Sequence, residues 1–231
     1  KLISFFLLPL YSQKLPADQF GYFDYTVTIV TIVVGTVCIE LWVGAIRFLL
    51  ARDGRKAKDA VVCNSLVLAG ISCLLLAGIG GVLSLLLPVP YLPYVFFYGL
   101  AYLFQSLYGS FARGFGRNMD FAVSGILSGV VNMLVNVVFI GALGGGVEVL
   151  YLAFIAGAAV QVGYIEIRLR LLKSVRRENF SPALLRELLR FCMPLFINSV
   201  SYWLLSSYSK LVIGGTLGMG ANGIYSMALR F

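Results

Sequence analysis

The chain has 231 residues, of which 60% are hydrophobic and only 12% are charged, and its formal net charge is +8. A soluble domain of this length could not cover its surface with so few charged side chains, so a water-soluble fold is excluded. The mean hydropathy of +0.92 indicates a protein that crosses a membrane several times.

Three stretches lack Asp, Glu, Lys and Arg altogether, namely residues 60–112, 121–147 and 191–209. They are far longer than the ~10 residues of a barrel strand, whereas a helix needs ~20 residues to span a bilayer. We therefore predict an all-α polytopic membrane protein with six complete helices and two partial ones. In chain order these helices are expected at residues 1–12, 22–50, 60–87, 94–112, 121–142, 149–167 and 191–216, with a last one starting at 222.

Basic residues alternate between the connecting segments. One side of the membrane holds only Lys14, and the other holds Arg52, Arg55, Lys56, Lys58, Arg113, Arg117, Arg168, Arg170, Lys173, Arg176, Arg177, Arg186 and Arg190. The positive-inside rule makes the basic side cytoplasmic, which predicts a multi-pass protein of the cytoplasmic (inner) membrane with its N-terminus inside. The net charge is explained by topology, so no nucleic-acid partner is expected.

The sequence divides into two lobes and a linker. We expect an N-terminal six-helix lobe at 1–167, a basic cytoplasmic linker at 168–190 and the start of a C-terminal lobe at 191–231. Ser181 and Pro182 suit the N-cap and first position of a short helix at 183–190, whose leucines and charges suggest that it lies in the membrane interface.

A weak internal repeat supports the lobe boundary. The pattern Leu15-x5-Gly21-Tyr22-Phe23 is echoed 202 residues later by Leu217-x5-Gly223-Ile224-Tyr225. Transporters are commonly built from such repeats, so the pattern predicts a parent chain of about twelve helices or more, of which this sequence is a piece. The apolar runs that begin after Lys1 and stop at Phe231 are consistent with that expectation.

Residues 190–218 carry a polar face on an otherwise apolar helix, beside Lys210. Its members are spaced by four, four and three residues, and they are Asn198, Tyr202, Ser206 and Ser209. Pro194 and the pair Gly214 and Gly215 predict a bendable segment. The face either lines a polar cavity or belongs to a bundle helix whose hydroxyls bond to their own backbone and whose Lys210 snorkels outward.

Two further helices carry ladders of polar groups at four-residue spacing. They are Ser124, Ser128, Asn132 and Asn136 beside Gly125 and Gly129, and Tyr94, Tyr98, Tyr102, Ser106 and Ser110. Amides, hydroxyls and phenols suit a sugar ligand, with Tyr98, Tyr102, Asn132 and Asn136 as candidates. The alternative is that the ladders hold helices together, which the glycines favour for the first of them.

Charged residues within spans are rarer. Glu40 is expected about 16 Å from the cytoplasmic end of its helix, near the bilayer centre. Arg47, Lys210 and Arg113 would together form a cationic cavity that binds a pyrophosphate, with Glu40 as their counter-ion or as an ion-coupling site. Alternatively, Arg47 snorkels to the interface.

Other chemistry finds little support in the sequence. The chain has no histidine, and its cysteines (Cys38, Cys63, Cys73 and Cys192) fall inside spans without a paired motif, which indicates packing residues. We predict no metal site, no cofactor and no enzymatic activity.

The segment 194–231, PLFINSVSYWLLSSYSKLVIGGTLGMGANGIYSMALRF, resembles the start of the second half of the polysaccharide biosynthesis and O-antigen flippase family. That family lies within the superfamily of multidrug, oligosaccharidyl-lipid and polysaccharide exporters. Residues 9–23, 44–51 and 112–140 resemble its opening loop, the end of its second helix and its fourth-to-fifth connection. Ser209 and Lys210 stand where many members have an Asp-Arg pair.

The resemblance implies that a lipid-linked oligosaccharide, carried on undecaprenyl pyrophosphate, is moved across the membrane by alternating access between two six-helix lobes. Membrane lipids are then partners, and a polysaccharide polymerase and glycosyltransferases are candidate partners. A cation-coupled multidrug or metabolite exporter ranks second, because only Glu40 is a deep acid. A membrane-embedded glycan polymerase or acyltransferase ranks third, since the outer loops are short.

Overall fold

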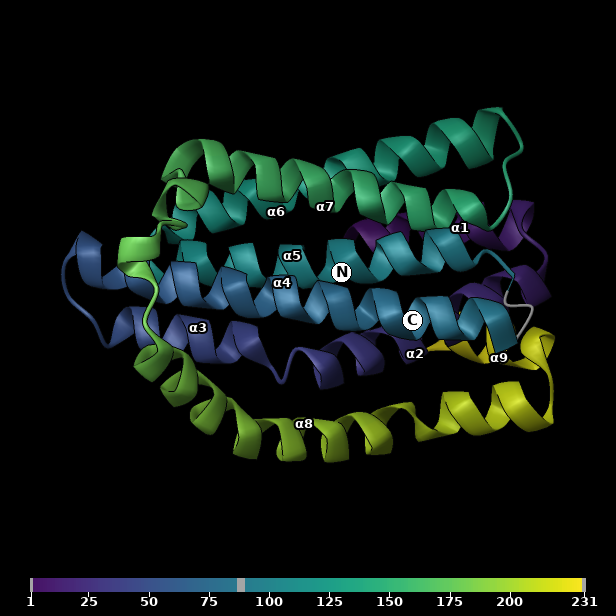
Figure 1. Ribbon diagram of the computed structural model, residues 1–231. Coiled ribbons are helices and arrows are strands. Elements are labelled where there is room, and N and C mark those ends of the chain that lie inside the picture. Colours follow the sequence, from purple (N-terminus) through teal and green to yellow (C-terminus); the bar gives the residue numbers. More distant parts are fainter. Residues whose placement is uncertain (1, 87–89, 230–231) are drawn as a thin grey trace.

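The computed structural model describes residues 2–86 and 90–229, together with the side chains of these residues except 2–6, 8, 203 and 206. The long helices run side by side in one bundle (Figure 1). In chain order they are α1 (Leu2–Lys14), α2 (Ala17–Val37), α3 (Leu41–Leu50), α4 (Arg55–Leu86), α5 (Leu92–Gly114), α6 (Asn118–Asn136), α7 (Glu148–Leu169), α8 (Pro182–Thr216) and α9 (Met219–Ala228). A π-helical turn η1 (Val137–Ala142) extends α6, and 3₁₀ turns η2 (Leu171–Ser174) and η3 (Arg177–Asn179) lie in the linker.

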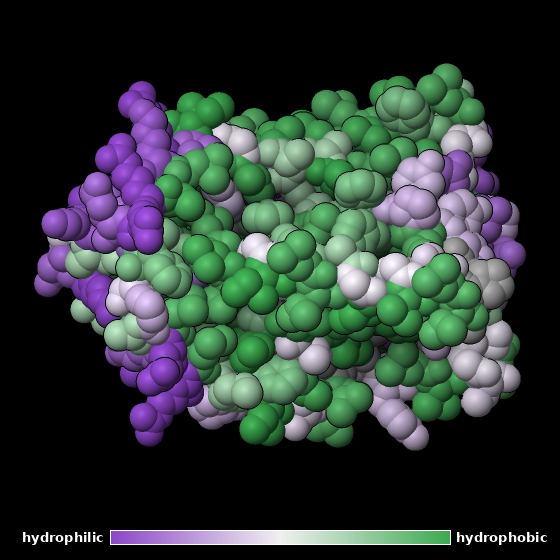
Figure 2. All heavy atoms as spheres, viewed as in Figure 1, coloured by the Kyte–Doolittle hydropathy of each residue, from purple (hydrophilic) through white to green (hydrophobic). Residues whose placement is uncertain are grey.

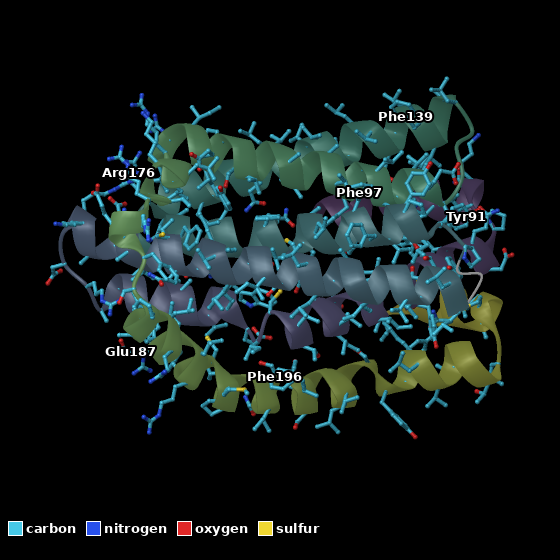
Figure 3. The ribbon with its side chains drawn as sticks, in the orientation of Figure 1. Tyr91, Phe97, Phe139, Arg176, Glu187 and Phe196 are labelled. Atoms are coloured by element: carbon cyan, nitrogen blue, oxygen red, sulfur yellow. The ribbon has the colours of Figure 1, made fainter. Side chains whose placement is uncertain are left out.

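The bundle has two chemically different ends. We call the end formed by the turns at 51–54, 115–117 and 170–181 the basic end, and the end formed by 15–16, 143–147 and 217–218 the distal end. Figure 2 shows hydrophilic residues at both ends, most densely at the basic end, and a hydrophobic belt along the middle of the bundle. Arg176 and Glu187 lie at the basic end, and Tyr91 lies at the distal end (Figure 3).

The predicted all-α membrane architecture is confirmed for the described residues. Four helical segments are long and apolar enough to cross a bilayer, and a bent pair within α8 adds a fifth; the four are Ala17–Val37, Arg55–Leu86, Asn118–Ala142 and Glu148–Leu169. Large apolar side chains such as Leu74 and Leu85 of α4 are exposed, as expected of surfaces that face lipid.

Two expected elements differ from those observed. The helix expected at 22–50 is interrupted at Ile39 and Glu40, so it forms α2 and α3. The short helix expected at 183–190 is not separate, because α8 runs on from Pro182 to Thr216, with Ser181 capping it as predicted through a 3.4 Å bond from the Leu184 amide. The bend in α8, of 51°, falls between Tyr202 and Ser207 rather than at Pro194.

Within the bundle, α6 packs on α7, α7 on α5, and α5 on α3. The Ser124 and Ser128 ladder is buried, and Ser128 meets Gly157 of α7. The prediction that Gly125 allows close helix packing was wrong, since a Cβ atom on Gly125 would meet nothing within 4 Å among the described residues. The glycine that permits the close approach lies on the facing helix.

The linker folds back onto the basic end of α4. Asn64, fully buried on α4, donates from Nδ2 to the Asn179 carbonyl (3.2 Å) and accepts from the Ser181 amide (3.3 Å). The Ser174 hydroxyl donates to Asp59 at 2.7 Å. Because α8 begins directly after these contacts, the docked linker fixes where α8 leaves the rest of the bundle.

Candidate functional site

The break between α2 and α3 places an acid inside the bundle. Ile39 (φ 49°) and Glu40 (φ 53°) adopt left-handed backbone conformations, which cost about 1–3 kcal/mol each in a residue with a side chain. Leu41 then restarts the helix, and the Gly44 amide bonds to the Glu40 carbonyl at 3.4 Å. Neither Gly nor Pro marks the break, so the sequence gives no signal of it.

Glu40 is 6% exposed and lies between two helices of the bundle. A small hollow beside it is lined by residues from α2 and α8, among them Gly35, Phe196 and Ser199. Ser199 and the Trp42 indole flank the carboxylate, and Tyr102 of α5 meets Trp42 edge-on with ring centroids 6.0 Å apart. Among the described side chains, no basic group lies within ion-pairing distance of Glu40.

Lys210 pairs instead with Asp24 on α2. Its Nζ atom donates to Asp24 Oδ2 at 2.8 Å, and the Ser226 hydroxyl of α9 donates to the same oxygen at 2.7 Å. The Asp24 side chain is 8% exposed and the Lys210 side chain 23%. We had predicted from the sequence that Glu40 is the counter-ion of Lys210. The structure corrects this prediction, because Lys210 pairs with Asp24. The signal for Asp24 is its position directly after the repeated Gly-Tyr-Phe pattern, on one face with Thr28 and Thr31.

A third feature is a pocket at the basic end, between α3 and α8. It has a volume of about 490 Å³ and is lined by Arg47, Phe48, Ala51, Arg52, Glu187, Arg190 and Phe191. The Arg47 guanidinium stacks 4.5 Å above the Phe191 ring, and Arg52 lies 3.5 Å from Glu187. Three guanidinium groups face one carboxylate, so the pocket is positive and suits an anionic ligand. We call it the arginine pocket.

Arg113 lies elsewhere. Its guanidinium donates to the Gly109 carbonyl (3.3 Å) and to the Ser110 hydroxyl (3.2 Å), and it stacks 4.8 Å from the Phe121 ring. Arg47, Lys210 and Arg113 therefore have three separate sets of contacts. The structure does not bring them into the single cationic cavity that the sequence analysis expected.

The remaining candidate binding residues are dispersed. Tyr98 is buried in an aromatic cluster, stacked on Phe154 with a centroid distance of 4.3 Å. Asn136 is buried and bonds to Asn132 within its own helix. Asn198 and Tyr202 are exposed, and the side chain of Ser206 lies outside the described residues. Roles for these residues in binding a sugar stay predictions.

The apolar belt and the helices long enough to cross a bilayer define a multi-pass membrane protein. Residues 15–231 match the family model described as polysaccharide biosynthesis protein, and the chain belongs to that family.

Two solved structures share the fold. An inward-facing multidrug resistance MATE family transporter of the MOP superfamily matches 96% of this chain with a TM-score of 0.66 and 19% identity. A MATE protein in the bent conformation matches 96% of this chain with a TM-score of 0.56 and 17% identity. The chain spans 57% and 59% of the lengths of these two proteins. No curated protein sequence matches the chain.

Proposed function

We propose that this chain forms the first lobe, and the start of the second, of a transporter that moves an anionic lipid-linked oligosaccharide across the cytoplasmic membrane. Its family is described as acting in polysaccharide biosynthesis, and its fold is that of exporters in the MOP superfamily. The excess of basic residues supports a cytoplasmic position for the basic end under the positive-inside rule. The distal end then faces outward.

The arginine pocket is the observation that carries the proposal. It lies at the basic end, between α3 and α8. A lipid-linked saccharide made in the cytoplasm presents its diphosphate at that depth of the membrane, while its isoprenoid chain stays in the hydrocarbon. Guanidinium groups bind phosphate oxygens through paired, charge-assisted hydrogen bonds. Phe48 and Phe191 supply apolar surface beside those groups.

An exporter of cationic compounds is the second candidate, because Asp24 and Glu40 are buried acids. Asp24 is already neutralised by Lys210, which leaves Glu40 as the acid available to a cationic drug. One acid against three pocket arginines favours an anionic cargo.

The test replaces the pocket cations in the full-length protein. Arg47→Gln and Arg190→Gln should each reduce transfer of a lipid-linked saccharide to the outer leaflet of reconstituted vesicles by tenfold or more, with protein abundance unchanged. Arg186→Gln is the matched control, because Arg186 is exposed on the same turn of α8 but does not line the pocket. Saccharide transfer at the normal rate in both pocket variants, or export of a cationic dye that depends on Glu40, would contradict the proposal.

A further inference from the structure

A second hollow lies at the basic end, where the linker meets the start of α4. It has a volume of about 470 Å³, and none of the residues that line it lines the arginine pocket. We call it the linker pocket, and Figure 3 labels one of its residues, Arg176. Its charged wall residues are Arg55, Lys56 and Asp59 of α4 and Lys173, Arg176 and Glu178 of the linker.

The linker backbone is held in place around this pocket. The buried Ser174 hydroxyl donates to Asp59 at 2.7 Å, and the Asn179 side chain donates to the Ser174 carbonyl at 2.8 Å. The Arg176 carbonyl accepts from the Cys63 thiol of α4 at 3.6 Å. Because these bonds fix both the near and the far part of the wall, the pocket is built into the fold.

The linker pocket carries an excess of positive charge. Arg55 and Asp59 neutralise each other, since their side chains pair at 2.8 Å. Three further cations of the pocket are exposed and have no ion-pair partner among the described side chains, namely Lys56, Lys173 and Arg176. They share the pocket with one remaining carboxylate, that of Glu178. The pocket therefore suits a ligand with more than one negative charge.

The linker also exposes large apolar side chains. Leu172 is 59% exposed, Val175 46% and Phe180 40%, and each adjoins a pocket-lining residue in the sequence. Segments that mix basic and exposed apolar residues lie at the membrane interface, with the apolar groups in the acyl region and the cations at the phosphates. This pattern points to a lipid as the source of the negative charge.

We propose that the linker pocket binds the phosphate groups of an anionic phospholipid, whose acyl chains extend into the membrane beside the exposed apolar residues of the linker. Basic pockets at the ends of transmembrane helices bind such headgroups. Three unpaired cations suit a lipid with two phosphates better than a lipid with one. Because α8 begins directly after the linker, the bound lipid holds the linker on α4 and so fixes the start of α8.

The experiment measures how strongly a lipid protects the linker from trypsin. Full-length protein in a neutral detergent is digested at increasing mole fractions of cardiolipin, which has two phosphates, and cleavage after Arg176 is followed by mass spectrometry. Cardiolipin should slow this cleavage several-fold, because a guanidinium that binds a headgroup cannot enter the protease. Phosphatidylcholine, whose headgroup has no net charge, should protect at least tenfold more weakly. Equal protection by the two lipids, or none by cardiolipin, would overturn the proposal.

Charge variants test the pocket itself. The double variant Lys56→Gln and Lys173→Gln should need more than ten times as much cardiolipin, at about fivefold for each charge lost near a membrane surface. Glu178→Gln should need several-fold less, because it removes the competing carboxylate. Arg177→Gln is the matched control, since Arg177 is exposed on the same turn but does not line the pocket, and it should respond like the parent. Parent-like responses from the double variant and from Glu178→Gln would contradict the assignment.

A last comparison separates a lipid from a free phosphate compound. Inorganic pyrophosphate carries the same groups without acyl chains, so it should protect far less than cardiolipin at equal concentration. Leu172→Ser should weaken protection by cardiolipin, whereas Met119→Ser, at an exposed apolar position that begins α6, should not. Equal protection by pyrophosphate would overturn the lipid assignment. No saccharide cargo is present in these assays, so their failure and the failure of the proposed function are distinguishable.

Discussion

Gly157 on α7 lies so close to Ser128 on α6 that a Cβ atom at residue 157 would stand 2.7 Å from the Ser128 carbonyl oxygen and 3.0 Å from its hydroxyl. A carbonyl in a helix cannot move aside without loss of backbone bonding. The pair therefore fixes how closely α6 and α7 approach each other.

Gly157→Ala should destabilise the protein by about 1–3 kcal/mol, the usual cost of forcing extra volume into a packed interior. Gly163→Ala is the matched control on the same helix, since a Cβ atom there would meet nothing within 4 Å. Thermal unfolding in detergent, followed by tryptophan fluorescence, measures the difference. Equal midpoints for the two variants would mean that α6 and α7 are further apart than described.

The docked linker gives a second prediction. Asn64→Ala removes both the acceptor of the Ser181 amide and the donor to the Asn179 carbonyl, which leaves two backbone groups without these partners. Each such loss costs about 1–3 kcal/mol when the group stays buried. Trypsin should then cut after Arg176 and Arg177 several-fold faster than in the parent protein. Gly70→Ala, at an open position on α4, should leave the cleavage rate unchanged.

A third prediction concerns Asp120, which begins α6 at the basic end. Its carboxylate pairs with Arg117 and Arg168 and accepts from the Tyr164 hydroxyl at 3.3 Å, while its own side chain is 8% exposed. Asp120→Ala should lower the thermal midpoint, because it removes the anion that Arg117 and Arg168 share. Asp53→Ala, at an exposed loop position, should have no measurable effect in the same thermal assay. Equal loss from both variants would show that only net charge matters.

The sequence was sufficient for the helices and their alternation. Runs without charges such as 60–112 have one physical solution in a bilayer, and basic loops mark one side. The repeat also located Gly21 and Gly223, which meet in space. In contrast, the break at Ile39 and Glu40 has no local signal, because neither residue is a helix breaker and the break depends on the surrounding packing.

The pairing of charges could not be predicted for the same reason. Lys210 and Asp24 are 186 residues apart in sequence, and the choice between Asp24 and Glu40 depends on how α2 and α8 lie against each other. Periodicity predicted a polar face of α8 that includes Asn198 and Tyr202, and both side chains are exposed, but periodicity could not say which helices that face meets. Tyr98 satisfies the same ladder pattern as Tyr102, but it is buried among aromatic rings.

The last prediction asks whether Glu40 matters for transport through its carboxylate or through the helix break that it forms. A charged carboxylate at the centre of a bilayer costs about 2.5–3.5 kcal/mol on insertion scales, and no basic side chain among the described residues compensates it. Glu40→Gln keeps the shape and removes the charge, so the variant should be at least as stable as the parent. Asp24→Asn should be less stable, because it breaks the ion pair with Lys210.

Glu40→Gly tests the backbone separately. Glycine tolerates the left-handed conformation (φ 53°) that the break requires, so relief of strain should offset the lost side-chain contacts. If the carboxylate matters for transport, Glu40→Gln and Glu40→Gly should both fold, with thermal midpoints within a few degrees of the parent, and both should lose transfer of cargo in vesicles. If only the break matters, both variants should transport normally. A large loss of stability in Glu40→Gln would show instead that the carboxylate has a basic partner, which would restore the counter-ion role that the sequence analysis gave it.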